Sequence, residues 1–188
     1  MKRRLVESME MQVFATTANL DILYSNMVAG WRGIPYGELS TLLGYLTFLS
    51  QVHHNHHWIA QGDPFYGDHQ LFDRLYSGAN GEVDSVAEKA VGLGSRANVD
   101  LFTLCGQVNK WVSTMYTGAS TIPSPNELAR RSLDCEMAFL KFSALTAQLL
   151  EGQGMLTRGL DNMLQGLEDT HESAVYLLKQ RCISGASF

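Results

Sequence analysis

Apolar residues recur every three or four positions along most of this 188-residue chain, and that spacing restricts its fold more than any other feature. It places the apolar side chains on one face of an α-helix. The chain holds only four prolines, and long stretches have none, which favours helix over a turn-rich β fold. We expect a short helix within 98–117 and longer helices over 5–29, 38–60, 64–93, 127–150 and 155–181.

The breaks between these helices predict the topology. Gln61–Phe65 and Glu151–Gly154 are short, and short turns force neighbouring helices to run antiparallel. The clearest loop, Gly118–Asn126, lies inside a long crossover between the two pairs. One long crossover is the ferritin-like form of the four-helix bundle. We therefore predict an all-α bundle domain over 37–188, with a short helix in the crossover, and an extra N-terminal helical segment over 1–36.

Two local signals predict the bounds of the longest helix. Asp63 precedes Pro64, and an Asp caps free N–H groups while a Pro suits the first helical position. Gly94 is a typical residue for the end of a helix.

Composition limits the classes of function. The net charge is −5, whereas a nucleic-acid binder needs a basic face; the basic cluster at Lys2, Arg3 and Arg4 is short. No apolar run approaches the roughly 20 residues that cross a membrane. The cysteines are odd in number and far apart, which favours free thiols in a reducing cytosol. We expect a soluble cytoplasmic protein.

Five of the six histidines lie between positions 53 and 69, and carboxylates follow them. Imidazole and carboxylate are metal-ligand groups. On a helix with about 100° per residue, Asp73, Asp84 and Glu88 fall about 40°, 60° and 100° from His69. These four side chains therefore form one stripe on the helix 64–93.

The stripe is too long for one metal. At a rise of about 1.5 Å per residue, Asp73 and Asp84 lie roughly 16 Å apart, and His69 and Glu88 roughly 28 Å apart. If two copies of the helix pack antiparallel about a two-fold axis, His69 and Asp73 of one copy face Asp84 and Glu88 of the other. Taken singly, each acid is more often a solvated surface residue.

His57 extends the stripe from the preceding helix, because the turn Ile59–Pro64 brings it close to His69. The remaining histidines of the cluster are His53, His54 and His56. We do not assign them as ligands, since a helical His is more often hydrogen-bonded or exposed. His53 lies one turn before His57 and could face the site.

The chain resembles the Dps family of mini-ferritins over residues 57–94. The family motif is matched without a gap by His57, Trp58, Gly62, Phe65, His69, Asp73, Asp84, Glu88 and the run Gly92–Gly94. The similarity in the last two helices is looser.

This resemblance implies a dodecameric shell that oxidises Fe(II), often with hydrogen peroxide, and stores ferric mineral inside. It implies ferroxidase centres shared between subunits, with iron as the bound metal and zinc or another divalent ion as an alternative at the same position. By this carry-over one subunit supplies His57, His69 and Asp73, and its neighbour supplies Asp84 and Glu88. Trp58 lies near that centre in the family, and packing at the interface is an equal interpretation.

Two further features concern the last helix. Glu168 and His171 have the spacing of a ferritin-type ligand pair, but helix 64–93 lacks a second such pair, so we interpret them as a surface or interface feature. Asp161 could line an acidic entry pore. Two alternative functions stay open: a nucleoid-type protein that binds DNA with minor iron chemistry, and a helical bundle with a scaffold role.

Overall fold

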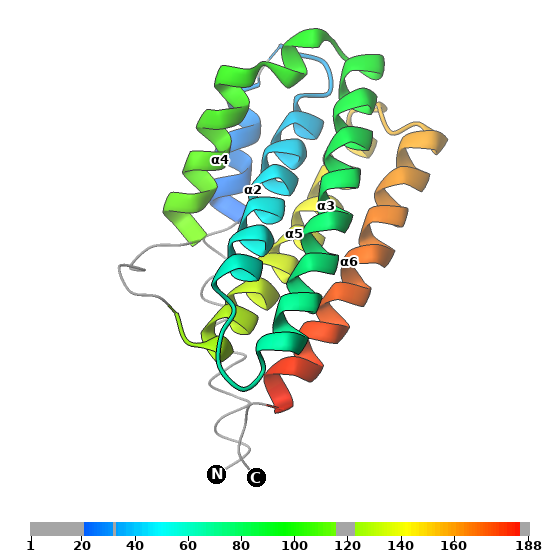
Figure 1. The fold of residues 1–188 in the computed structure, drawn as a ribbon. Coiled ribbons are helices and arrows are strands. Elements are labelled where there is room, and N and C mark those ends of the chain that lie inside the picture. Colours follow the sequence, from blue (N-terminus) through cyan, green and yellow to red (C-terminus); the bar gives the residue numbers. More distant parts are fainter. Residues whose placement is uncertain (1–20, 32, 116–122, 185–188) are drawn as a thin grey trace.

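The computed structural model describes residues 21–31, 33–115 and 123–184 (Figure 1). Across these residues there are helices, turns and loops and no strand, which confirms the predicted all-α class. Predictions for 5–20, for Lys2–Arg4 and for 116–122 lie outside the described residues. After the helical residues 21–29 come α2 (Gly37–Ile59), α3 (Phe65–Leu93), the 3₁₀ helix η1 (Arg96–Val99), α4 (Leu101–Met115), α5 (Pro125–Gly152) and α6 (Arg158–Ser184).

Four long helices, α2, α3, α5 and α6, form a bundle (Figure 1). The chain turns back between α2 and α3 and again between α5 and α6, so each pair is antiparallel. Between the pairs, η1 and α4 return along the bundle, and α4 packs against α2. The predicted long crossover with a helix inside it is therefore present.

The core is built around the aromatic ring of Tyr45 on α2. Its ring meets Trp111 of α4 and Phe142 of α5 edge-on, with centroids 4.8 and 4.9 Å apart. Its hydroxyl donates to the Cys135 carbonyl at 2.9 Å, so its one polar group is satisfied. All three rings are fully buried. The rings of Trp111 and Phe142 also contact each other, with centroids 4.9 Å apart, so this aromatic group joins α2, α4 and α5.

Residues 21–29 share this core. Tyr24 and Met27 are buried in it, and the Tyr24 ring stacks on Phe142 with centroids 5.0 Å apart. The Tyr24 hydroxyl is hydrogen-bonded to Thr146, and Lys141 pairs with Asp21 at 2.7 Å. The division into 1–36 and 37–188 stays a prediction, but the described part of the N-terminal segment packs as part of the bundle.

The predicted cap at Asp63 is wrong in detail. Pro64 occupies the N-cap position of α3, and no side chain caps this end. The reason is the geometry of the turn that precedes α3. Gly62 has a φ of 78°, and its carbonyl oxygen accepts a hydrogen bond from the Phe65 N–H at 3.0 Å. This turn moves the first residue of the helix one position along the chain. At the other end, Gly94 is the C-cap, as predicted.

We expect Phe142→Ala to lower the free energy of unfolding by about 3–5 kcal/mol, because it empties a fully buried site among three aromatic rings. Equilibrium denaturation in urea at matched protein concentration measures the loss. Leu149→Ala, on an exposed part of the same helix, is the control and should cost less than about 1 kcal/mol. Equal losses in both variants would contradict this account of the core.

Candidate metal centre

The turn between α2 and α3 brings His57 and His69 together. Their rings are stacked, with centroids 3.8 Å apart and planes inclined by 22°. Each ring nitrogen Nδ1 lies 3.0 Å from the backbone carbonyl oxygen of the other residue. This reciprocal pair of hydrogen bonds joins the last turn of α2 to the first turns of α3. The predicted proximity of these two histidines is therefore present in the fold.

The hydrogen bonds also fix the tautomers. A carbonyl oxygen only accepts, so Nδ1 of both His57 and His69 must carry a proton and donate. In the neutral ring, Nε2 then carries the free lone pair. Metal-binding histidines are commonly oriented in this way, by a hydrogen bond from the nitrogen that does not bind the metal. Both imidazoles are half-buried and keep one nitrogen for a ligand.

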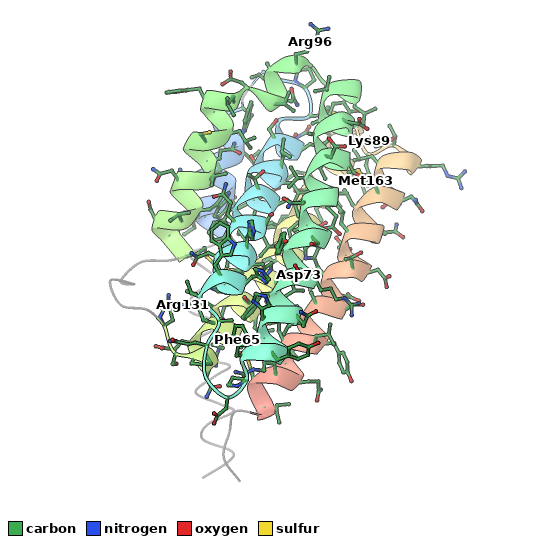
Figure 2. The ribbon with its side chains drawn as sticks, in the orientation of Figure 1. Phe65, Asp73, Lys89, Arg96, Arg131 and Met163 are labelled. Atoms are coloured by element: carbon green, nitrogen blue, oxygen red, sulfur yellow. The ribbon has the colours of Figure 1, made fainter. Side chains whose placement is uncertain are left out.

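The predicted carboxylates follow along α3. Asp73 is half-buried one turn after His69, and Figure 2 labels it part-way along α3, beyond Phe65. Asp84 and Glu88 are exposed farther along the same helix. In the described part of the subunit, none of the three carboxylates has a hydrogen bond or ion pair. Among those same residues, no group of three or more His, Cys, Asp or Glu side chains is arranged to hold a metal ion.

Aromatic side chains extend from the histidine pair across the surface. The ring of His54 lies between Trp58 and Tyr76, at 4.1 and 4.2 Å, and Tyr76 meets His57 edge-on at 5.6 Å. Phe65 stacks on His69 at 5.1 Å. Trp58 is 65% exposed. Sequence reasoning did not find Tyr76 or the place of His54, because both depend on how α2 and α3 pack.

A second set of polar side chains lies inside the bundle, and sequence reasoning missed it. His53 donates through Nε2 to Glu136 at 2.8 Å. His171 donates through Nδ1 to the other oxygen of Glu136 at 2.5 Å and through Nε2 to Glu82 at 2.8 Å. The suggestion that His53 faces the His57 site is therefore wrong, since His53 is fully buried in the bundle. We call His53, Glu82, Glu136 and His171 the core cluster.

The interpretation of Glu168 and His171 as a surface feature is also wrong for His171. Its side chain is 4% exposed and lies between two carboxylates. The signal that could have revealed this is Glu136 itself, a single charged residue between Cys135 and the apolar run Met137–Leu140 on α5. Each member of the core cluster comes from a different helix: α2, α3, α5 and α6.

Hydrogen bonding and burial oppose one another in the core cluster. Burial alone would raise the pKa of Glu136, but the hydrogen bonds from His171 and His53 outweigh it and lower the pKa to about 2. Burial alone would lower the pKa of His171, but the hydrogen bonds to Glu136 and Glu82 raise it to about 9. At neutral pH an imidazolium therefore lies between carboxylates inside the bundle.

A fifth and a sixth side chain extend the core cluster toward the turn. Ser132 Oγ lies 3.2 Å from Nδ1 of His53 and 2.8 Å from Nδ1 of His56. Burial, then the nearby His53 and Arg131, lower the pKa of His56 to about 3, so this ring is neutral. His56 thus lies on the inner side of α2, next in sequence to His57 on its outer side.

We expect the core cluster to make stability depend on pH in a defined direction. The raised pKa of His171 adds stability that is complete below pH 6.5 and is lost as the pH rises through about 9. The lowered pKa of Glu136 adds stability that is complete above pH 4.5 and is lost as the pH falls through about 2. Melting temperatures of the native protein and of His171→Gln between pH 5 and 10 measure the first contribution.

The gap between the two melting temperatures should narrow above pH 6.5 and be smallest beyond pH 9. Glu172→Gln, an exposed neighbour on α6, should follow the native protein at every pH. A gap that stays constant across the range would show that the His171 pairs are not the source.

Comparison with known proteins defines the class. Two solved structures share the fold. DpsC from Streptomyces coelicolor has a TM-score of 0.62 and 18% sequence identity, and the match covers 78% of this chain and 83% of that chain. Dps from Thermosynechococcus elongatus has a TM-score of 0.56 and 18% sequence identity, and the match covers 88% of this chain and 93% of that chain. The chain therefore shares the helical-bundle fold of these two Dps structures.

Sequence comparison adds a local match. The chain is 39% identical over 41 residues to a curated protein from Brevibacillus brevis named DNA protection during starvation protein, and this match covers 22% of this chain and 28% of that relative. No family model matches the chain. The short match and the two structural neighbours all support the Dps family, which confirms the resemblance predicted from the motif. In the described part of the chain, no helix is long and apolar enough to span a bilayer.

Proposed function

We propose that this protein is a ferroxidase of the Dps type that oxidises Fe(II), with hydrogen peroxide as oxidant, and stores the ferric product inside a cytoplasmic shell of twelve subunits. The observation that carries the proposal is the His57–His69 pair, which is held through Nδ1 and leaves Nε2 of both rings for a ligand. Asp73 follows one turn later on α3.

The donor set suits the substrate. Carboxylate oxygens are hard, charged donors that bind Fe(II) and bind Fe(III) more strongly, and imidazole adds neutral donors. Hydrogen peroxide accepts two electrons, one from each of two Fe(II) ions, so two neighbouring ions complete the reaction. A centre with few protein ligands leaves positions open for the oxidant. Zinc or another divalent ion could compete for the same donors.

The centre requires a second subunit. Asp84 and Glu88 are exposed on the α3 that carries His69 and Asp73, and neither has a partner within the described residues. Both lie too far along α3 to reach the same ion. An antiparallel α3 from the partner subunit would bring its Asp84 and Glu88 to the histidine pair, and a two-fold axis would create two such centres. Trp58, which follows His57, and Phe65, which stacks on His69, are exposed, as expected for a surface that a partner covers.

DNA binding is the weaker alternative. The net charge is −5, and the basic cluster Lys2–Arg4 lies outside the described residues. The name of the curated relative refers to DNA protection, which is a statement about that protein.

Asp161 lies in the first turn of α6. As part of the same proposal, its carboxylate lines an acidic pore through which iron enters the shell.

Mixing two inactive variants tests the shared centre. His69→Ala with Asp73→Ala removes one half, and Asp84→Asn with Glu88→Gln removes the other. Each variant alone should oxidise Fe(II) far more slowly than the native protein. When the two are unfolded, mixed in equal amounts and refolded together, about a quarter of the centres should be intact, because each mixed dimer has one native centre. Initial rates of Fe(II) oxidation with peroxide measure the recovery.

Asp169→Asn with Glu172→Gln, two exposed acids on α6, is the control for lost charge and should keep the native rate. No recovery on mixing, with both variants folded and assembled, would contradict a centre shared between subunits. Native oxidation rates in the Asp84→Asn, Glu88→Gln variant alone would contradict the proposed function itself.

Assembly gives an independent measurement. We expect the native protein to have about twelve times the mass of the 20.8 kDa chain in light scattering coupled to size exclusion. A monomer or a simple dimer would favour the alternative of a helical bundle with a scaffold role.

A further inference from the structure

The first turn of α3 has no buried apolar side chain that anchors it in the bundle. Of its residues Phe65–Asp68, only Asp68 is buried, and Phe65 and Tyr66 are 46% and 76% exposed. No side chain caps this end of the helix either. The rotation of the turn that leads into His69 therefore depends on what holds the Asp68 carboxylate.

Asp68 is held by Arg181, which lies in the last turn of α6. Arg181 donates through Nε to one carboxylate oxygen of Asp68 at 2.5 Å and through Nη2 to the other at 2.9 Å. Its Nη1 donates to the side-chain oxygen of Asn126, in the first turn of α5, at 3.1 Å. The start of α3, the start of α5 and the end of α6 meet at this end of the bundle (Figure 1). We call Asp68, Asn126 and Arg181 the end clamp.

The end clamp also determines the direction of the neighbouring row of side chains on α3. Asp68 and Phe72 are one turn apart and both are buried, so they form the inward row of the helix at this level. His69 and Asp73 each follow one of them in sequence and lie about 100° farther round the helix. A bidentate contact between a guanidinium and a carboxylate fixes direction as well as distance. Fixing the Asp68 carboxylate thereby fixes the rotation at which His69 leaves the helix.

His69 depends on that rotation because its hydrogen bond reaches a backbone oxygen on another helix. Its Nδ1 donates to the His57 carbonyl at 3.0 Å, and His57 donates to the His69 carbonyl at the same distance. A rotated first turn would lengthen both hydrogen bonds and turn Nε2 of His69 away from Nε2 of His57. Asp68 itself is not a ligand, since both of its oxygens accept from Arg181.

We infer that Asp68 and Arg181 are positioning residues of the metal centre, because their ion pair sets the rotation of the first turn of α3 and so the direction of the His69 imidazole. The inference rests on the proposed function, which assigns His69 as a ligand.

Exchange of Arg181 for lysine separates positioning from charge. Arg181→Lys keeps the positive charge but lacks the planar group that binds both carboxylate oxygens in a fixed geometry. We expect it to weaken Co²⁺ binding to the assembled protein by about tenfold, since loss of an outer-shell partner of a metal site costs about 10–100-fold. Titration followed by the visible absorption of protein-bound Co²⁺, well below the melting temperature, measures the affinity. Asp68→Asn should weaken binding similarly and serves if Arg181→Lys does not assemble.

Two controls exclude a general loss of charge or of stability. Arg130→Lys alters the partly exposed Arg130–Asp134 pair on α5 and should leave the Co²⁺ affinity unchanged. Phe142→Leu disturbs the fully buried aromatic group around Tyr45, away from the histidine pair, and should lower the melting temperature without changing the affinity.

A variant without the His69 imidazole shows whether Arg181 acts through it. In His69→Ala, the remaining Co²⁺ affinity should not fall further when Arg181→Lys is added, because the side chain that the end clamp positions is absent. An effect of Arg181 that bypasses His69 would lower the affinity by the same factor in both backgrounds.

Full Co²⁺ affinity in Arg181→Lys or in Asp68→Asn, once assembled, would overturn the inference, as would equal losses with and without His69. These outcomes leave the proposed function intact, since native Fe(II) oxidation and the mixing of variants test it separately. Native protein that neither binds Co²⁺ nor oxidises Fe(II) would overturn the proposed function and the inference together.

Discussion

The antiparallel contact between α2 and α3 is the constraint on which the rest of the structure depends. Gly62, with its positive φ, reverses the chain within a few residues, and the reciprocal hydrogen bonds of His57 and His69 join the two helices directly after the turn. With this end fixed, the register of α3 along α2 is fixed as well. The level of Asp73, Asp84 and Glu88 along the bundle follows from helix rise alone.

The histidine run at the end of α2 serves both faces of this helix. At about 100° per residue, His57 lies only about 40° from His53, whereas His54 and Trp58 lie about 100° and 140° from it, so the run crosses the boundary between the buried and the exposed face of α2. His53 and His56 are buried against Ser132 and Glu136, and the other three residues lie beside α3 near the surface. A run that reads as one metal-binding cluster in the sequence is divided by the helix into an inner and an outer part.

This division explains what the sequence could and could not predict. Helix spans, the crossover and the closeness of His57 to His69 depend on periodicity and on one short turn, which are local properties. The pairing of Glu136 with His53 and His171 joins positions 83 and 35 residues apart, and no local pattern specifies it. The shift of the α3 start from Asp63 to Pro64 has the same origin, because the turn geometry overrode the capping preference of Asp. Similarly, His53 was a candidate for the outer site only because the rotation of α2 was unknown.

The energetics of the core cluster bear on why such a group persists inside a bundle. Replacing a buried charged network by well-packed apolar residues is often neutral or stabilising, so the core cluster is weak evidence for stability. Breaking one member, by contrast, leaves an uncompensated charge, which costs several kcal/mol, about 3–5 in measured cases. Because its members come from α2, α3, α5 and α6, the hydrogen bonds are satisfied only when all four helices have the correct rotation and level. The core cluster therefore selects one register of the bundle, and the same register sets the outward direction of His57 and of the α3 stripe.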